Sequence, residues 1–325
     1  MAVGTERPLT AYCAVSRDKK YSSSISLLRT SIAGAVTVLR PFVPAYRLDS
    51  KRVHKPWGRH DLWQGFADEP AGSSPVGEVW FQTPKGVGHD NPELLIKYLF
   101  TSERLSVQVH PDDANARARG HKRGKSEAWY ILSAEPHATI AMGTLKPMNK
   151  DELRAASLSG TIVNLLDWKA VQADQFWYAP AGTLHAIGPG LVLVEIQQNI
   201  DLTYRLYDYG SGRELHLEDG IAVSNPIPYV APCKPRDLAD GRCLLVAERA
   251  IVVERWTLAT SRTLDSSTEC PIWLVPLEGR GMLDGQMVGP GGVWLTDGAV
   301  ALDVEEEIDL LACYAGGRIK DPVWR

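Results

Sequence analysis

The chain has 325 residues, of which 44% are hydrophobic and 23% charged, and its formal net charge is −4. This length allows one large domain or two modest ones, and the composition is that of an ordinary water-soluble protein. The charge gives no electrostatic reason to expect nucleic acid or an anionic membrane as a partner, and no apolar run reaches the ~18 residues that span a bilayer.

Residues 1–45 are rich in Ser and Arg and poor in acidic residues. This composition is weakly typical of a transit segment. We favour an upstream extension that is poorly ordered and lies outside the folded unit, because the patterned sequence starts only near Tyr46. The five cysteines are odd in number and form no C-x-x-C pair, which predicts reduced thiols and a cytoplasmic protein.

From residue 46 to residue 224, short apolar or alternating runs are separated by Gly, Pro, Asp and Asn, which predicts a series of strands. These runs are EVWFQTP, LLIKYLF, LSVQVHP, EAWYILS, HATIAMG, DQFWYAPAG and GLVLVEIQQN. Short helices are predicted at PDDANARAR and MNKDELRAASL, and GTIVNLLDW is a third candidate. Many short strands with few helices favour a mainly β sandwich or jelly roll over a parallel α/β sheet.

The Pro-rich stretch 225–237, NPIPYVAPCKPRD, is typical of a linker. A second β-rich block, residues 238–320, follows it. All eight histidines precede the linker. We therefore expect His-dependent chemistry in the first block, 46–224, and a degenerate β domain without a metal in the second.

The run LSVQVHPDD places Gln108 and His110 two residues apart, so on a strand their side chains lie on one face. Glu127 opens the next apolar strand, and it reaches the same pocket if the two strands pair as neighbours. His185 follows the tight turn of PAGTLH. Two imidazoles, an amide oxygen and a carboxylate form a ligand set that suits zinc or a similar borderline cation better than calcium.

Each of these residues alone has an ordinary interpretation. A single strand histidine is more often hydrogen-bonded than metal-bound, and we interpret His121, His137 and His216 in that way. The Q-x-H pair, the glutamate after one loop and the Pro-x-Gly-x-x-His turn are, however, three separate signals. Together they match the metal-bearing corner of the cupin jelly roll.

Several ionisable residues lie within or beside strand-forming runs. Lys97 stands in the middle of LLIKYLF, where an unpaired buried ammonium is costly, and a lysine that reaches the sheet surface is the alternative. Lys125 lies two residues before the predicted glutamate ligand and can share its face. The run VEIQQNIDLTYRLYDYG contains Glu195, Asp201 and Arg205, and the arginine lies between a tyrosine and a leucine, which is unusual for a solvated side chain.

The motifs KPWG, LSVQVHPDD, GKSEAWYIL, PAGTLHAIGPG and IQQNIDLTYRLYDYG resemble, in order, those of the zinc-dependent mannose-6-phosphate isomerases, specifically their short bacterial branch. The resemblance covers about residues 45–320. It implies a cupin domain with a short helical insert, then a second, degenerate cupin-like domain, and a phosphosugar substrate. It implies one zinc ion per chain, held by Gln108, His110, Glu127 and His185. It implies a substrate pocket lined by Lys97, Ser106, Lys125, Glu195, Asp201 and Arg205.

The chain departs from longer members of this family at two places. Those members have His-Lys-Pro-Glu where this chain has Gly-Lys-Ser-Glu at 124–127, so a histidine acid or base is not available at that position. Their large helical insert is reduced here to the segment around 145–170. A lid formed by that insert is therefore not expected.

The implied reaction interconverts mannose 6-phosphate and fructose 6-phosphate through a cis-enediol, with metal assistance. Arg205 is expected to stabilise the enediolate, with Asp201 or Glu195 holding its guanidinium. Phosphate or hydroxyl groups are expected to accept hydrogen bonds from Lys97, Ser106 and Lys125. The general base is open between Glu195, Asp201, Lys125 and a metal-bound water.

Two alternatives are a different metal-dependent cupin enzyme, such as an oxygenase or an epimerase, and a sugar-binding cupin without activity. An oxygenase has no use for several phosphate-binding cations. A binding protein would not need Lys97, Lys125 and Arg205 to converge on a metal. The sequence leaves the oligomeric state open.

Overall fold

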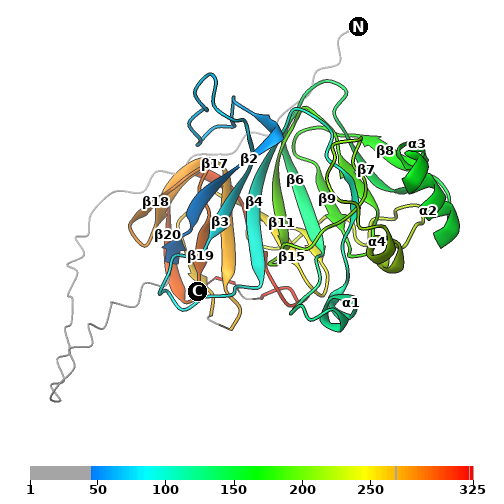
Figure 1. The fold of residues 1–325 in the computed structure, drawn as a ribbon. Coiled ribbons are helices and arrows are strands. Elements are labelled where there is room, and N and C mark those ends of the chain that lie inside the picture. Colours follow the sequence, from blue (N-terminus) through cyan, green and yellow to red (C-terminus); the bar gives the residue numbers. More distant parts are fainter. Residues whose placement is uncertain (1–44, 268, 322, 325) are drawn as a thin grey trace, which may run out of the picture. The chain divides into compact units, whose positions relative to one another are not determined.

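The computed structural model describes residues 45–267, 269–321 and 323–324, and in these residues the named strands pair antiparallel to form three sheets (Figure 1). The extension expected at 1–45 lies outside the described residues, apart from Ala45. No helix of the described part is long and apolar enough to cross a membrane. The predicted mainly β fold class is confirmed.

The six-stranded sheet forms the middle layer of the described region. Its strands, in spatial order, are β2 (Asp49–Arg59), β3 (Val76–Gln82), β4 (Leu94–Thr101), β11 (Leu191–Gln198), β6 (Glu127–Ala134) and β9 (Phe176–Ala179). Every residue of β4 and β11 is buried, because both faces of this sheet are covered. The near-continuous apolar runs LLIKYLF and LVLVEIQQ follow from that burial.

The five-stranded sheet packs against one face of the six-stranded sheet. Its strands, in spatial order, are β12 (Tyr204–Tyr207), β5 (Val107–Val109), β10 (His185–Ile187), β7 (Thr139–Thr144) and β8 (Leu166–Ala170). Leu99, Trp129 and Leu193 of the larger sheet share a buried cluster with Met142 and Ile187 of the smaller one. Both sheets therefore bury their facing sides, which is the arrangement of a jelly roll.

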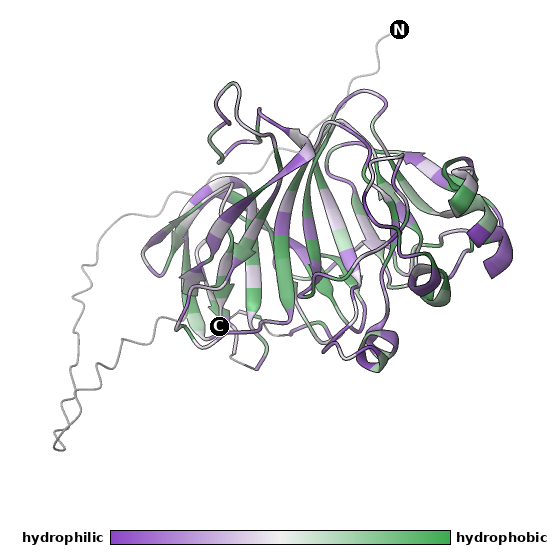
Figure 2. Cartoon of the chain, in the orientation of Figure 1, coloured by the Kyte–Doolittle hydropathy of each residue, from purple (hydrophilic) through white to green (hydrophobic). Residues whose placement is uncertain are grey.

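Helices cover the other face of the five-stranded sheet. They are α2 (Lys150–Ser159), α3 (Ile162–Leu165) and α4 (Leu217–Val223), whose apolar residues join the cluster on that face. The predicted helices at PDDANARAR and MNKDELRAASL are confirmed as α1 (Asp113–Ala118), which is largely hydrophilic in Figure 2, and α2. Asp112 and Asn149 cap their N-termini. GTIVNLLDW gives only the single turn α3 before β8 begins, and α4 was not predicted.

The nine-stranded sheet packs against the opposite face of the six-stranded sheet. Its main path is β1 (Ala45–Arg47), β19 (Trp294–Thr296), β17 (Ile272–Leu283), β20 (Ala299–Tyr314), β15 (Val252–Leu258), β14 (Arg242–Ala247) and β13 (Arg236–Asp237), with β16 (Arg262–Asp265) on β20 and β18 (Gln286–Val288) on β17. Tyr98 and Val194 of the middle layer share one buried cluster with Trp273 and Val275. Consecutive residues of β4 thus point alternately to the two outer layers.

The two expected domains share this core, since one buried cluster contains residues of both blocks. The strand β1 lies at the start of the first block in sequence but pairs with β19 of the second. Residues 225–228 lie against the first block, since the backbone N–H of Thr144 donates to the carbonyl of Ile227. The domain boundaries at 46–224, 225–237 and 238–320 stay a prediction, because a shared core does not test whether each block folds alone.

Candidate metal centre and substrate cavity

Three of the four predicted ligands meet inside the jelly roll. The donor atoms of His110, Glu127 and His185 all lie within 4.8 Å of one another, and each residue is at most 2% exposed. Nε2 of His185 lies 3.0 Å from Oε1 of Glu127, and Nε2 of His110 lies 3.3 Å from Oε2. Two imidazoles therefore converge on one buried carboxylate.

The way in which these residues meet differs from the sequence expectation. Glu127 was expected to reach the pocket if β5 and β6 pair as neighbours, and that condition is not met: β5 belongs to the five-stranded sheet and β6 to the six-stranded sheet. The chain crosses from one sheet to the other through α1 and the basic loop. Glu127 meets the histidines because stacked sheets lie only ~10 Å apart, a gap that side chains from both sides fill.

Gln108 lies beside the three converging residues. It is the register partner of His185 in the pairing of β5 with β10, so the two side chains lie on the same face of the sheet. Its Oε1 accepts a hydrogen bond from Oγ of Ser106 at 3.4 Å. This position suits a fourth ligand, and the ligand role of Gln108 stays a prediction.

Backbone carbonyls orient both imidazoles. Nδ1 of His110 donates to the carbonyl of Leu202 at 3.0 Å, and Nδ1 of His185 donates to that of Thr183 at 2.9 Å. A carbonyl only accepts, so each Nδ1 carries a proton, and in a neutral ring Nε2 then presents its lone pair to Glu127. Burial and the ammonium of Lys125 lower the pKa of His110 to about 3, which keeps this ring neutral near pH 7.

The buried polar atoms fit a divalent cation. Neither oxygen of Glu127 nor Nε2 of His185 has a hydrogen-bond partner among the described residues. The ammonium of Lys125 lies 3.1 Å from Oε2 of Glu127 and 3.3 Å from Nε2 of His110. Oε1 of Glu127 and Nε2 of His185 are left as two acceptors facing each other. That contact is unfavourable alone and becomes favourable with a cation between them.

Backbone contacts fix the loop that carries Lys125 and Glu127. The N–H of Lys125 donates to the carbonyl of Pro111, and the N–H of Gly124 donates to Oδ1 of Asp113, both at 2.9 Å. A Cβ at position 124 would lie 2.4–2.6 Å from the backbone of residues 111–113. The structure has no room there for the histidine that longer family members carry.

Burial raises the pKa of Glu127, but Lys125 and the imidazoles lower it well below its usual value.

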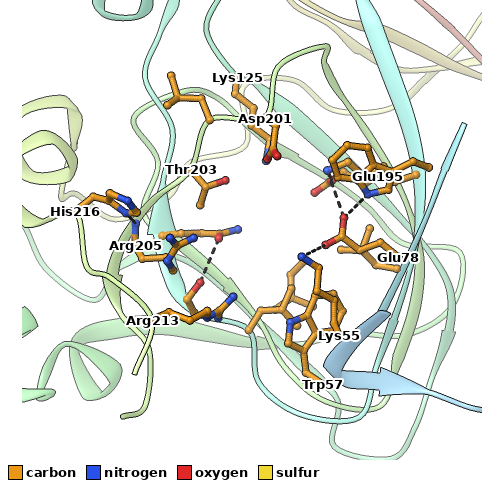
Figure 3. Close-up of a pocket in the computed structure, with 18 residues that line it drawn as sticks. Lys55, Trp57, Glu78, Lys125, Glu195, Asp201, Thr203, Arg205, Arg213 and His216 are labelled. Carbon is orange, nitrogen blue, oxygen red and sulfur yellow. Dashed lines mark hydrogen bonds and ion pairs between the residues drawn. The ribbon is translucent and has the colours of Figure 1, made fainter. Parts of the chain in front are cut away.

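A cavity of about 380 Å³ is lined by Gln108 and by Lys125, the lysine that contacts Glu127 (Figure 3). All six predicted substrate residues line it: Lys97, Ser106, Lys125, Glu195, Asp201 and Arg205. Polar and aromatic residues that the sequence reasoning did not assign to the pocket also line it: Lys55, Trp57, Glu78, Trp80, Thr203, Arg213 and His216.

The missed residues differ in the signal that they leave in the sequence. Lys55 and Trp57 belong to the motif KPWG, which the sequence reasoning noted without giving its residues a role. Arg213 lies on a loop with no periodic pattern. His216 was interpreted as a hydrogen-bonded residue, and its Nδ1 does accept the N–H of Arg205 at 3.3 Å, but it also lines the cavity.

One wall of the cavity carries paired lysines and glutamates. Lys97 is 5% exposed, and its Nζ lies 3.1 Å from Oε2 of Glu195. Burial lowers the pKa of Lys97, but Glu195 and Glu78 more than offset that effect and hold the pKa above its usual value. The alternative of a lysine that reaches the sheet surface is therefore wrong. Lys97 is a buried, charged and paired residue.

The opposite wall carries two arginines (Figure 3). Arg205 was expected to be held by Asp201 or Glu195, but its Nε donates instead to the carbonyl of Glu214 at 3.0 Å. The loop after β12 folds back and brings that carbonyl within reach, while Glu195 is engaged by Lys97. Nε and Nη2 of Arg213 each lie 2.6 Å from a carboxylate oxygen of Asp208.

Known proteins resemble the chain in sequence and in fold. Mannose-6-phosphate isomerase ManA of Bacillus subtilis (strain 168) is 38% identical over 214 residues, which are 62% of this chain and 67% of that protein. The chain belongs to the mannose-6-phosphate isomerase family. Mannose-6-phosphate isomerase of Streptococcus mutans is 43% identical over 136 residues, 40% of this chain and 43% of that protein. The chain thus spans from less than half to about two thirds of these relatives' length, and no family model matches it.

Solved structures of mannose 6-phosphate isomerases cover more of the chain. The crystal structure of the Bacillus subtilis enzyme aligns with a TM-score of 0.69 and 25% identity, over 83% of this chain and 99% of that one. A zinc-bound mannose 6-phosphate isomerase aligns with a TM-score of 0.66 and 14% identity, over 84% of this chain and 100% of that one. The predicted family and cupin-type fold are confirmed, whereas the roles of single residues stay predictions.

Proposed function

We propose that this chain is a mannose-6-phosphate isomerase that interconverts mannose 6-phosphate and fructose 6-phosphate in the cytoplasm. One observation carries the proposal: Lys125, whose ammonium contacts Glu127 of the buried His–Glu–His cluster, lines a cavity together with four more cationic and three acidic side chains. Family membership supports it. Neither an oxygenase nor a sugar-binding protein explains why lysines, arginines and carboxylates gather at one metal-type site.

Gln108, His110, Glu127 and His185 would hold one zinc ion, as the buried acceptor atoms of this cluster favour. When bound, the ion polarises the substrate carbonyl and stabilises negative charge on oxygen. The carbonyls that accept from both Nδ1 atoms keep the imidazoles aimed at the site.

The isomerisation moves a proton between C2 and C1 of the open-chain sugar, so a base must stand beside these carbons. Of the candidates on this chain, Glu195 is paired with Lys97 at 3.1 Å and Lys125 is paired with Glu127 at 3.1 Å. Asp201 lines the cavity and makes no ion pair among the described residues. Asp201 is therefore the base that the geometry favours.

The charges of the two walls differ, which suggests how the substrate lies. On the lysine–glutamate wall, Lys55 and Lys97 are balanced by Glu78 and Glu195, a pattern that suits neutral sugar hydroxyls. Arg205 has no carboxylate partner among the described residues, so its guanidinium is open to an anion. The arginine wall therefore suits the phosphate and the charge that develops on the enediolate.

A coupled assay of the purified protein with mannose 6-phosphate tests the proposal. We expect formation of fructose 6-phosphate, its loss after treatment with a chelator, and its recovery when zinc is restored. Binding of the sugar phosphate without turnover would favour a binding protein. Oxygen consumption, or epimerisation without ketose formation, would favour another cupin enzyme.

A further inference from the structure

The motif KPWG forms an enlarged β-bulge beside the cavity. In the pairing of β2 with β3, His54 and Arg59 both take Val76 as register partner, so residues 55–58 protrude from the ladder. The bulge packs closely, since a Cβ added at Gly77 would lie 2.6 Å from Cβ of Lys55. Bulges re-aim side chains next to active sites, and this one directs Lys55 towards the cavity (Figure 3).

Lys55 begins a line of alternating charges across neighbouring strands. Its Nζ lies 3.8 Å from Oε1 of Glu78, whose Oε2 lies 3.6 Å from Nζ of Lys97. Nζ of Lys97 lies 3.1 Å from Oε2 of Glu195. The four side chains come in turn from β2, β3, β4 and β11, and all of them line the cavity.

Glu78 holds the central place in this line. Its Oε2 accepts a hydrogen bond from Nε1 of Trp80 at 2.6 Å, and the Trp80 ring lies 4.6 Å from the Lys97 ammonium. The side chain of Glu78 is 13% exposed, and that of Lys97 is 6% exposed. Glu78 and Glu195 thus pair with the Lys97 ammonium from opposite sides, and the hydrogen bond from Trp80 fixes the position of Glu78.

We infer that Glu78 is a positioning residue for the proposed isomerisation: it holds the Lys97 ammonium in place, so that Lys97 and Glu195 present a donor and an acceptor to the sugar hydroxyls. The inference rests on the proposed function. Lys97 then touches the substrate, while Glu78 acts through Lys97. The KPWG bulge contributes by bringing Nζ of Lys55 to 3.8 Å from Oε1 of Glu78.

The substitution Glu78→Gln tests this role, because glutamine keeps the shape and still accepts the Trp80 N–H while the charge is lost. We expect the KM for mannose 6-phosphate to rise about tenfold, the equivalent of ~1.4 kcal/mol, with kcat changed much less. Zinc content and melting temperature should match the wild type. Glu78→Asp should restore part of the loss, and Glu103→Gln, the same change at an exposed site, should leave the KM unaltered.

A double-mutant cycle with Lys97→Gln separates the positioning role from a general effect. If Glu78 acts through Lys97, then Glu78→Gln should change kcat/KM little once Lys97 is replaced. An unchanged KM in Glu78→Gln, whether or not the melting temperature falls, would overturn the inference but not the proposed function. Absence of turnover by the zinc-loaded wild type would instead overturn the proposed function, and the inference with it.

Discussion

Oε1 of Glu127 and Nε2 of His185 lie 3.0 Å apart, although the two residues belong to different sheets. Nδ1 of His185 donates to the carbonyl of Thr183, so in the neutral imidazole Nε2 faces the carboxylate as a second acceptor. Two facing acceptors inside a protein need a cation between them. This relationship is the structural reason to expect a metal rather than an internal hydrogen bond.

The substitution Glu127→Gln should remove the metal. It takes the only acidic residue out of the predicted ligand set, so we expect metal affinity to fall by on the order of 10²-fold or more, with a corresponding loss of turnover. Metal analysis of dialysed protein measures this directly. Glu103→Gln, at an exposed site, should keep one zinc per chain. A Glu127→Gln protein with full zinc content would contradict the predicted ligand set.

The substitution Gly124→Ala should disturb both cavity and metal centre. The added Cβ would lie 2.4–2.6 Å from the backbone of residues 111–113, so the loop that carries Lys125 and Glu127 must shift. We expect a loss of roughly 1–3 kcal/mol in the free energy of unfolding, and reduced activity. Gly289→Ala is a matched control, because the nearest atom to its Cβ would be 3.8 Å away. Equal urea midpoints for the two variants would refute the steric argument.

Local pattern was enough to predict many of the strands, the family and six residues of the cavity. The Q-x-H spacing put Gln108 and His110 on one face, and the apolar residues around Lys97 in LLIKYLF marked it as an unusual buried lysine. Both signals depend only on neighbours in the sequence. The face-to-face meeting of β5 and β6 depends on how sheets stack, which no local pattern encodes. The pairing of these consecutive strands, on which the placement of Glu127 was conditional, therefore does not occur.

The residues that sequence reasoning missed have partners that only the fold supplies. Glu78 alternates with apolar residues on β3 and looks like an ordinary solvent-facing position until Lys97 and Lys55 are placed beside it. The carbonyl that holds Arg205 belongs to Glu214, and it arrives through a loop that folds back on β12. Backbone acceptors of this kind carry no side-chain signature in the sequence.

Removing the second block should destabilise the first. Trp273 is 1% exposed and packs in the cluster that covers Tyr98 and Tyr130 of the middle sheet. We expect Trp273→Ala to lower the free energy of unfolding by about 3–5 kcal/mol, and truncation after residue 237 to give insoluble protein. Urea denaturation measures the first effect, with Met287→Ala, 73% exposed, as the control. A soluble, fully active truncated chain would show that the first block folds independently.

The pair of Asp208 and Arg213 should set the affinity for the phosphate end of the substrate. Burial raises the pKa of Asp208, but Arg213 and Ser211 lower it below the usual carboxyl value. The pair therefore contributes stability above the ordinary carboxyl pKa and loses it only as the pH falls through the lowered value. Asp208→Asn removes the carboxylate that holds Nε and Nη2 of Arg213 in place, so the guanidinium loses its fixed position, and we expect a KM about 5- to 10-fold higher at pH 7. An unchanged KM would remove Arg213 from the phosphate site.

The substitution Arg205→Lys tests the remaining catalytic assignment. The Nε of Arg205 is held by the carbonyl of Glu214, and the rest of the guanidinium lines the cavity without a carboxylate partner among the described residues. Lysine keeps the charge but loses both the Nε anchor and the planar fork, so the change is not conservative here. If the contact strengthens as negative charge develops, kcat should fall by about 10²-fold or more with a smaller change in KM.

Zinc content should stay normal in Arg205→Lys, because the side chain is not a predicted ligand. Steady-state kinetics beside a melting curve distinguish the two roles that the geometry allows. If Arg205 only holds the loop after β12 in place, the variant will have a lower melting temperature and an unchanged kcat. If Arg205 stabilises the enediolate, the variant will have a lower kcat at an unchanged melting temperature. This is the result that we expect, because the guanidinium has no carboxylate partner among the described residues.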